Sequence, residues 1–237
     1  TRVHGDELAS TAKNPTDSIM LGGPLAKALP EKIEFAKLPW LPVKHAVVSD
    51  VRDQGGKWVN QPGYLVHHGD RYWAMWSDGP GVPQTTPDKH RNRVPGHDQP
   101  DTRVYFATSK DGATWSRPQS LSGPHRREGF GWIARGFWVR DGQLLALDTH
   151  FNAPGYMGQG LSLEAFRWEE ADGKWFVHGT VFDDAMNNFP PKKLPSGDWM
   201  MTRRHHQGHI SMLVGGSNAF DDWQVIPLPK YGGRQKP

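Results

Sequence analysis

The residues able to transfer protons or bind anions gather in a few segments of this 237-residue sequence. Histidine, tyrosine and aspartate suit general acid–base or nucleophilic chemistry, and the candidates are His150, Tyr156, His205, Asp78 and Asp148. The arginine candidates for substrate binding are Arg135, Arg203 and Arg204. Because a guanidinium presents a planar fork of N–H donors, clustered arginines favour bidentate binding of a carboxylate or sulfate. Arg135 interrupts the apolar stretch WIARGFWV, where a charge requires a partner or a ligand.

Two stretches admit a metal interpretation. In RRHHQGH, Arg203 to His209, two imidazoles could share a zinc ion. In GHDQPD, Gly96 to Asp101, carboxylates could ligate calcium. The histidine spacing is not a known zinc signature, so we expect no metal or other cofactor, with zinc and calcium as the alternatives.

The composition narrows the classes of protein. The absence of cysteine excludes a disulfide framework and thiolate metal sites, and a formal charge of +3 is too small to indicate a nucleic-acid partner. No apolar run approaches the roughly 18 residues of a membrane span. The 27 glycines and 20 prolines favour short strands and turns, and 11 tryptophans compensate for a hydrophobic content of only 36%. We expect neither a nucleic-acid nor a membrane partner, and a secreted or periplasmic location, with no signal peptide in this sequence.

Three stretches of the sequence resemble one another: His68–Gly79, Arg140–Phe151 and Pro195–His206. Each combines a Gly/Asp turn with an alternating strand, follows another plausible strand, and precedes a turn that closes on a tryptophan. The closing residues are Trp115, Trp175 and Trp223, at intervals of 60 and 48 residues. This pattern predicts repeated four-stranded antiparallel units near the period of propeller blades. An ordinary meander sandwich with coincidental Asp-Gly turns is the alternative.

The fullest closing turn reads SKDGATW, Ser109 to Trp115. Its Asp-Gly pair favours a two-residue hairpin turn with positive φ, Ser109 and Thr114 can hydrogen-bond the turn backbone, and Trp115 can fold back as an apolar plug.

This turn resembles the Asp-box of the sialidase superfamily of β-propellers, and RVYFATSKDGATWSRPQSL resembles its strand–box–strand context. The resemblance covers roughly residues 45–228. It implies an all-β propeller of four-stranded antiparallel blades, here incomplete, with about four blades of a six- or seven-bladed ring. We expect an extended arm over residues 1–30 and the partial propeller over residues 31–237.

In that family the Asp-box turns lie on the face away from the active site. The opposite face then carries the other loops, and aligning the turns places Asp78, His150 and His205 at equivalent positions. The same loops hold further charged residues: Arg126, Arg127, Asp98, Asp101, Asp183 and Asp184. We therefore expect the site on this face.

The resemblance implies a carbohydrate-active protein with an acidic oligo- or polysaccharide as partner. Sialidases carry an Arg-Ile-Pro motif on the first inner strand, but the matching place here reads Asn60-Gln61-Pro62. The arginine role is therefore not carried over, and Asn60 and Gln61 are assigned to substrate binding. Three hypotheses remain open: a glycoside hydrolase acting on an acidic glycan, a lyase that cleaves a uronate-containing polymer by β-elimination, and a non-catalytic glycan- or protein-binding propeller.

Overall fold

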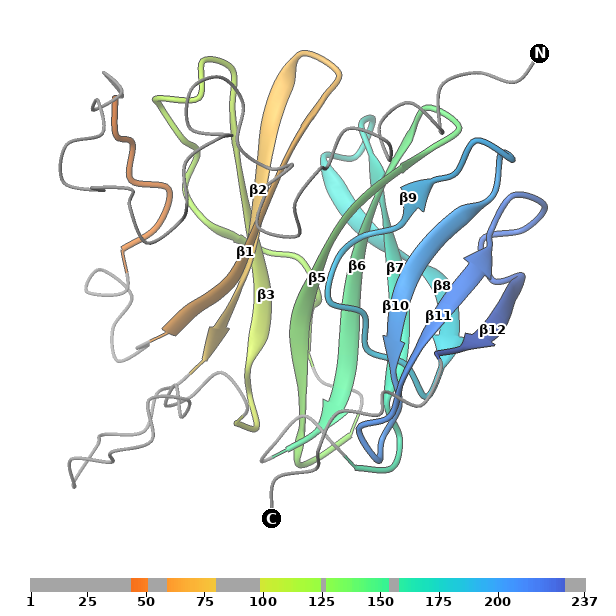
Figure 1. The fold of residues 1–237 in the computed structure, drawn as a ribbon. Coiled ribbons are helices and arrows are strands. Elements are labelled where there is room, and N and C mark those ends of the chain that lie inside the picture. The colour runs from red at the N-terminus through yellow and green to blue at the C-terminus, as the bar shows by residue number, and fades with distance from the viewer. Residues whose placement is uncertain (1–43, 51–58, 80–98, 125–126, 154–157, 229–237) are drawn as a thin grey trace, which may run out of the picture. The chain divides into compact units, whose positions relative to one another are not determined.

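The computed structural model describes residues 44–50, 59–79, 99–124, 127–153 and 158–228, shown as coloured ribbon in Figure 1. The chain divides into a unit Thr1–Lys44 and a unit His45–Pro237. The predicted arm over residues 1–30 lies outside the described residues. All elements described here belong to the second unit.

Three four-stranded antiparallel sheets make up the described fold, and each contains four consecutive strands. The first sheet holds β1 (Val59–His68), β2 (Arg71–Gly79), β3 (Arg103–Ser109) and β4 (Gln119–Ser120). The second holds β5 (Phe130–Arg140), β6 (Gln143–Asn152), β7 (Ser162–Glu169) and β8 (Lys174–Asp183). The third holds β9 (Lys192–Lys193), β10 (Trp199–Arg204), β11 (Ile210–Gly215) and β12 (Trp223–Pro227).

The repeated four-stranded unit predicted from the sequence is therefore confirmed, and the described residues contain no helix. No described segment could cross a membrane as a helix. The expected number of blades differs, because three sheets rather than about four are described, and these three do not close into a ring.

The second sheet packs between the other two, which explains why β5 and β6 are apolar on both faces. Ala146 of β6 packs in one cluster with Trp73 and Met75 of the first sheet. Its neighbour Leu145 points the opposite way and packs with Met201 of the third sheet. Because strand side chains alternate between faces, a sheet covered on both sides reads as a continuous buried run.

The closing tryptophans hold comparable places in the three units. Trp175 of β8 packs against the first sheet, with its ring centroid 5.7 Å from that of Trp73. Trp223 of β12 packs against the second sheet, with its ring centroid 5.7 Å from that of Trp138. Trp115 lies against the other face of the first sheet. Trp115 is only half-buried, so the predicted plug is partial.

The turn Ser109 to Trp115 is longer than the predicted two-residue hairpin, because β4 begins only at Gln119. Gly112 has a positive φ of 71°, but Asp111 does not. The Asp111 carboxylate accepts hydrogen bonds from the backbone N–H groups of Thr114 (2.7 Å) and Ala113 (2.9 Å). These bonds lower the pKa of Asp111 to about 2. The Asp111 carboxylate thus fixes the backbone of this longer loop, and a two-residue hairpin is not required for these hydrogen bonds.

The turns between first and second strands lie at the same end of the fold as the turns between third and fourth strands. Arg71, after the β1–β2 turn, bonds Glu170 of the β7–β8 turn at 2.8 Å. Arg140, before the β5–β6 turn, donates from Nε to the carbonyl of Gly216 in the β11–β12 connection at 3.1 Å. We call this the turn end and the opposite end the site end.

Candidate functional site

Most of the predicted site residues lie at the ends of second strands. Asp78 is the last residue but one of β2, His150 is the third from the end of β6, and His205 follows the last residue of β10. Arg203 and Arg204 are the last two residues of β10. The sequence alignment of the turns therefore places these residues correctly at the site end. Their chemical roles remain predictions.

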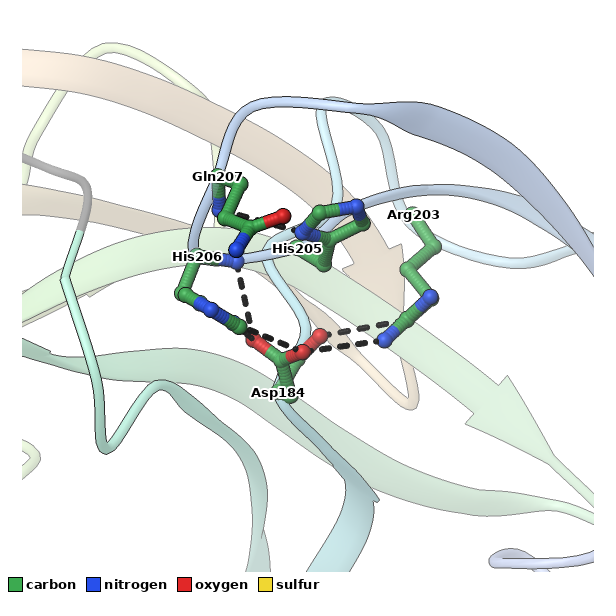
Figure 2. A network of polar contacts seen from close by, with 5 residues as sticks. All are labelled: Asp184, Arg203, His205, His206 and Gln207. Carbon is green, nitrogen blue, oxygen red and sulfur yellow. Dashed lines mark hydrogen bonds and ion pairs between the residues drawn. The ribbon is translucent and has the colours of Figure 1, made fainter.

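Asp184 is the centre of a polar network at this end (Figure 2). Its carboxylate accepts a hydrogen bond from Nη2 of Arg203 at 3.2 Å and one from the backbone N–H of His206 at 2.8 Å. Both carboxylate oxygens lie 3.1 Å from Nδ1 of His206. Nε of Arg203 also donates to the Asp184 carbonyl at 3.1 Å. The network joins the residue after β8 to the end of β10.

The backbone holds Asp184 in an unusual conformation, with a positive φ of 50°. Its N–H donates to the carbonyl of Leu161 at 2.8 Å, which anchors the residue next to the start of β7. Burial raises the pKa of the Asp184 carboxyl, but the hydrogen bonds from His206 and the charge of Arg203 outweigh this effect, so its pKa lies below the usual value. Asp184 is therefore ionised near neutral pH.

His205 has different surroundings from its neighbour. Its Nδ1 accepts a hydrogen bond from the backbone N–H of Gln207 at 3.0 Å. Its ring centroid lies 5.4 Å from that of His206 and 4.8 Å from that of His209. Burial and the nearby His209 lower the pKa of His205, so a neutral ring is favoured near neutral pH.

Asp184, His205 and His206 are close enough together to be considered as metal ligands. The contacts of this group do not suit a cation, because Arg203 already bonds Asp184 and the backbone N–H of Gln207 occupies Nδ1 of His205. His205 would have to use Nε2, which carries the proton of the neutral ring. The predicted zinc alternative therefore has no support from this arrangement. The calcium stretch lies outside the described residues except for residues 99–101.

Arg135 and Asp148 form a second polar group, inside the protein. Only 7% of Arg135 and none of Asp148 is exposed. Burial lowers the pKa of Arg135 to about 10, Tyr64 and Asp148 favour its charged form, and Arg204 opposes it. Burial raises the pKa of Asp148 well above its usual value, although Arg135 acts in the other direction. Near neutral pH this group carries a charged guanidinium beside a carboxyl driven toward its neutral form.

The hydrogen bonding of this pair is incomplete. In the part of the chain that the structure describes, both carboxyl oxygens of Asp148 and Nε of Arg135 lack a hydrogen-bond partner. Buried polar groups are nearly always paired, and unpaired ones call for a water, an ion or a ligand. That Arg135 requires a ligand remains a prediction. Asp148 has no exposed surface, so its predicted catalytic role does not include direct contact with a ligand in this conformation.

A bulge in β5 gives Arg135 its position. The register with β6 shifts between Ala134 and Gly136, so Arg135 is the extra residue. Side chains of the neighbouring segments satisfy the backbone around it: the Ala134 N–H donates to Ser77 Oγ at 2.8 Å, and the Arg135 carbonyl accepts from Asn187 Nδ2 at 3.4 Å. Hydrogen bonds from Ser77 of β2 and from Asn187 after β8 therefore hold the bulge in place.

His150 lies in an aromatic environment. Its ring centroid is 4.7 Å from that of Phe130 and 4.5 Å from that of Trp132, and 6% of the residue is exposed. Arg127 lies over Phe130, with its guanidinium carbon 5.6 Å from the ring centroid. Packing between aromatic rings favours a structural contribution from His150, so its catalytic role remains a prediction.

The remaining candidates are dispersed. Nδ2 of Asn60 donates to Ser49 Oγ at 2.9 Å, Gln61 is exposed, and Asp78 is 2% exposed at a position opposite Asn60 in the sheet. Tyr156 lies outside the described residues.

The structure brings forward two residues that the sequence does not single out. Asp184 is one of several loop carboxylates in the sequence, and His206 enters only through the metal interpretation. In the sequence, only the chemical type of these two residues and the nearness of His206 to Arg203 could indicate them. The hydrogen bonds that join Asp184 and His206 depend on the turn after β10.

The sequence and the structure were compared with known proteins. No protein-family model and no curated protein matches the sequence. A Trypanosoma rangeli sialidase in complex with 2,3-difluorosialic acid is similar in structure, with a TM-score of 0.45, 12% identity, and coverage of 70% of this chain and 28% of that one. The same sialidase in complex with sialic acid gives a TM-score of 0.44, 11% identity, and coverage of 70% and 27%. A further sialidase gives 0.40, 13%, and coverage of 79% and 22%. The chain thus spans less than a third of the length of the sialidases to which it is similar.

Proposed function

We propose that this protein is carbohydrate-active and hydrolyses a glycosidic bond of an acidic glycan bound at the site end. The observation that carries the proposal is the positive charge of Arg135 and Arg204, neither of which forms an ion pair with a carboxylate among the described residues. Arg204 is half-buried and opposes the charge of buried Arg135, while Asp148 is driven toward its neutral form. A ligand carboxylate would offset both guanidinium charges and supply acceptors for their N–H groups.

The carboxyl groups of the site end support acid–base chemistry. Burial raises the pKa of Asp148, whereas its hydrogen bonds and Arg203 hold Asp184 ionised. Carboxyl groups whose environments push their pKa values apart supply one protonated and one ionised group, the two states that hydrolysis of a glycosidic bond requires. Direct proton donation from Asp148 would require a conformation in which its carboxyl is exposed, since none of it is exposed here.

One observation favours a second candidate, a polysaccharide lyase. Asp184 orients the His206 ring through Nδ1, and a carboxylate-held imidazole is a common base for abstracting a proton. In a lyase an arginine neutralises the uronate carboxylate while a base removes the neighbouring C–H proton. His206, held by Asp184, would supply the base, and Arg203 and Arg204 at the end of β10 would supply the arginine.

Binding and product analysis distinguish these functions. Wild-type protein is titrated with uronate oligosaccharides and with neutral oligosaccharides, and the products are analysed by mass spectrometry and ultraviolet absorbance. Hydrolysis adds one water to the products, whereas elimination adds none and creates an absorbing unsaturated uronate. Binding without either product would indicate a glycan-binding protein and contradict both enzymatic candidates.

Substitution of Arg135 and Arg204 tests whether their positive charge binds the acidic ligand. Arg135→Lys keeps the charge but loses the planar fork, and Arg204→Gln removes a charge; each should weaken uronate binding by about tenfold, the equivalent of one charge-assisted hydrogen bond. Arg117→Gln is the matched control, since Arg117 is exposed in the Asp-box connection. Melting temperatures would confirm that the variants are folded. Equal affinities for acidic and neutral ligands, or no effect in folded Arg135 and Arg204 variants, would refute the proposal.

A further inference from the structure

At the site end, the Nδ1 atoms of two consecutive histidines have different hydrogen-bond partners: one faces an acceptor and the other a donor. Nδ1 of His206 faces the carboxylate of Asp184, and Nδ1 of His205 faces the backbone N–H of Gln207. Figure 2 shows the His206 ring directed toward Asp184 and the His205 ring bonded to Gln207 on the other side. A carboxylate only accepts and a backbone N–H only donates, so each contact fixes where the ring carries its proton.

His206 must carry a proton on Nδ1. Asp184 is ionised near neutral pH, since its hydrogen bonds and Arg203 hold its pKa down. Its two oxygens already accept from the His206 backbone N–H and from Arg203, and they lie at 3.1 Å from Nδ1 as further acceptors. In a neutral ring with hydrogen on Nδ1, the Nε2 atom has a free lone pair.

His205 must have the opposite tautomer. Its Nδ1 accepts the Gln207 N–H at 3.0 Å and therefore carries no hydrogen. Burial and His209 lower the pKa of His205, which favours the neutral ring. The single ring proton then lies on Nε2, where it can be donated.

We infer that His205 and His206 form a donor–acceptor pair for a hydroxyl-bearing ligand, in which Nε2–H of His205 donates and Nε2 of His206 accepts. The ring centroids lie 5.4 Å apart, and both residues are half-buried, so one hydroxylated ligand can reach both. The pair rests on the proposed function only in taking that ligand to be a sugar.

The pair also allows a balanced proton transfer. A proton that His206 takes at Nε2 from a water, a hydroxyl or an acidic C–H leaves an imidazolium whose charge faces ionised Asp184, and the electron pair stays on the ligand. Asp184 is the positioning residue in this step, because it holds the Nδ1 proton, so that the lone pair of the neutral ring lies on Nε2.

The tautomers can be measured without any substrate. Long-range ¹H–¹⁵N spectra of labelled wild-type protein near neutral pH distinguish protonated from unprotonated ring nitrogens, with assignment by His205→Gln and His206→Gln. We expect a protonated Nδ1 in His206 and a protonated Nε2 in His205. The Asp184→Asn variant then tests whether the carboxylate sets the tautomer of His206. Asparagine suits this position because it tolerates the positive φ. It should reduce the Nδ1-protonated fraction of His206 and leave His205, the internal control, unchanged.

Each result has a defined meaning. The same tautomer in both rings of the wild type would overturn the pair, as would a His206 tautomer that Asp184→Asn leaves unchanged. Shifts of both Nε2 signals on addition of a galacturonate trisaccharide, larger than with maltotriose, would support the pair and the acidic-glycan proposal together. Opposite tautomers that respond to neither sugar would support the pair and count against the proposed ligand.

Discussion

The protonation state of Asp148 predicts in which direction the stability of the protein changes with pH. That direction shows whether the buried carboxyl is neutral or is ionised beside Arg135. The carboxyl has no exposed surface and no hydrogen-bond partner, and burial raises its pKa well above the ordinary value of 3.8. In the unfolded chain the carboxyl ionises near pH 3.8, but in the folded protein it keeps its proton to higher pH. The folded state then binds one more proton, so stability falls as pH rises through this window.

The magnitude follows from the linkage relation. Between the unfolded and the folded pKa, this carboxyl lowers the free energy of unfolding by about 1.4 kcal/mol for each pH unit. Asp148→Asn removes the titrating group and keeps a side chain of similar size. The stability of the variant relative to wild type should therefore grow as pH rises above about 5, by about 1.4 kcal/mol per pH unit for as long as Asp148 stays protonated in the folded protein.

Urea unfolding followed by tryptophan fluorescence at about pH 5, 6 and 7 measures this difference. Asp172→Asn, at an exposed position in the β7–β8 turn, is the control for removal of a carboxyl. If Asp148 is instead ionised and paired with Arg135, Asp148→Asn would leave an uncompensated buried charge. The variant would then be less stable by about 3–5 kcal/mol at neutral pH, and the reasoning would be refuted.

Two further predictions concern the turn end. Trp223→Ala should lower the free energy of unfolding by about 3–5 kcal/mol, because the 8% exposed ring packs against Trp138; an unchanged urea midpoint would contradict this packing role. Asp111 has a pKa lowered to about 2 by hydrogen bonds to its carboxylate, so its contribution to stability is present above pH 3.8 and is lost as pH falls toward 2. The melting temperature of wild type should therefore fall more steeply over that pH range than that of Asp111→Asn, and parallel curves would show that the carboxylate does not fix the turn.

The sequence predicts the repeated sheets well because their signals are local. Gly/Asp turns and closing tryptophans recur once per unit, and a strand between two turns needs little further information. The depth of burial depends on the neighbouring sheet and is not local. Trp223 packs against the second sheet and is only 8% exposed, whereas Trp175 against the first sheet and Trp115 on the outer face of the first sheet are both half-buried. The same motif therefore does not fix the burial of its tryptophan.

The site is harder to predict, because its key contacts arise where regular structure ends. The turn pattern puts the last residues of β10, Arg203 and Arg204, at the site end. A turn follows Arg204, in which the His205 N–H donates to the His209 carbonyl at 3.2 Å. Alternation no longer applies in that turn. The turn therefore decides which histidine faces Asp184, and this histidine is His206. The catalytic role of His205 remains a prediction.

The bulge in β5 has an analogous effect on charge. A regular strand would give Arg135 a neighbour on β6, but the shift between Ala134 and Gly136 leaves it as the unpaired extra residue. A buried guanidinium is stable only with a compensating partner. Asp148, the nearby carboxyl, is itself disfavoured as an anion by burial. Among the described residues, the bulge therefore leaves a buried guanidinium beside a carboxyl that burial drives toward its neutral form. If the proposed anionic ligand binds here, its affinity should depend on Arg135 more than on exposed Arg117.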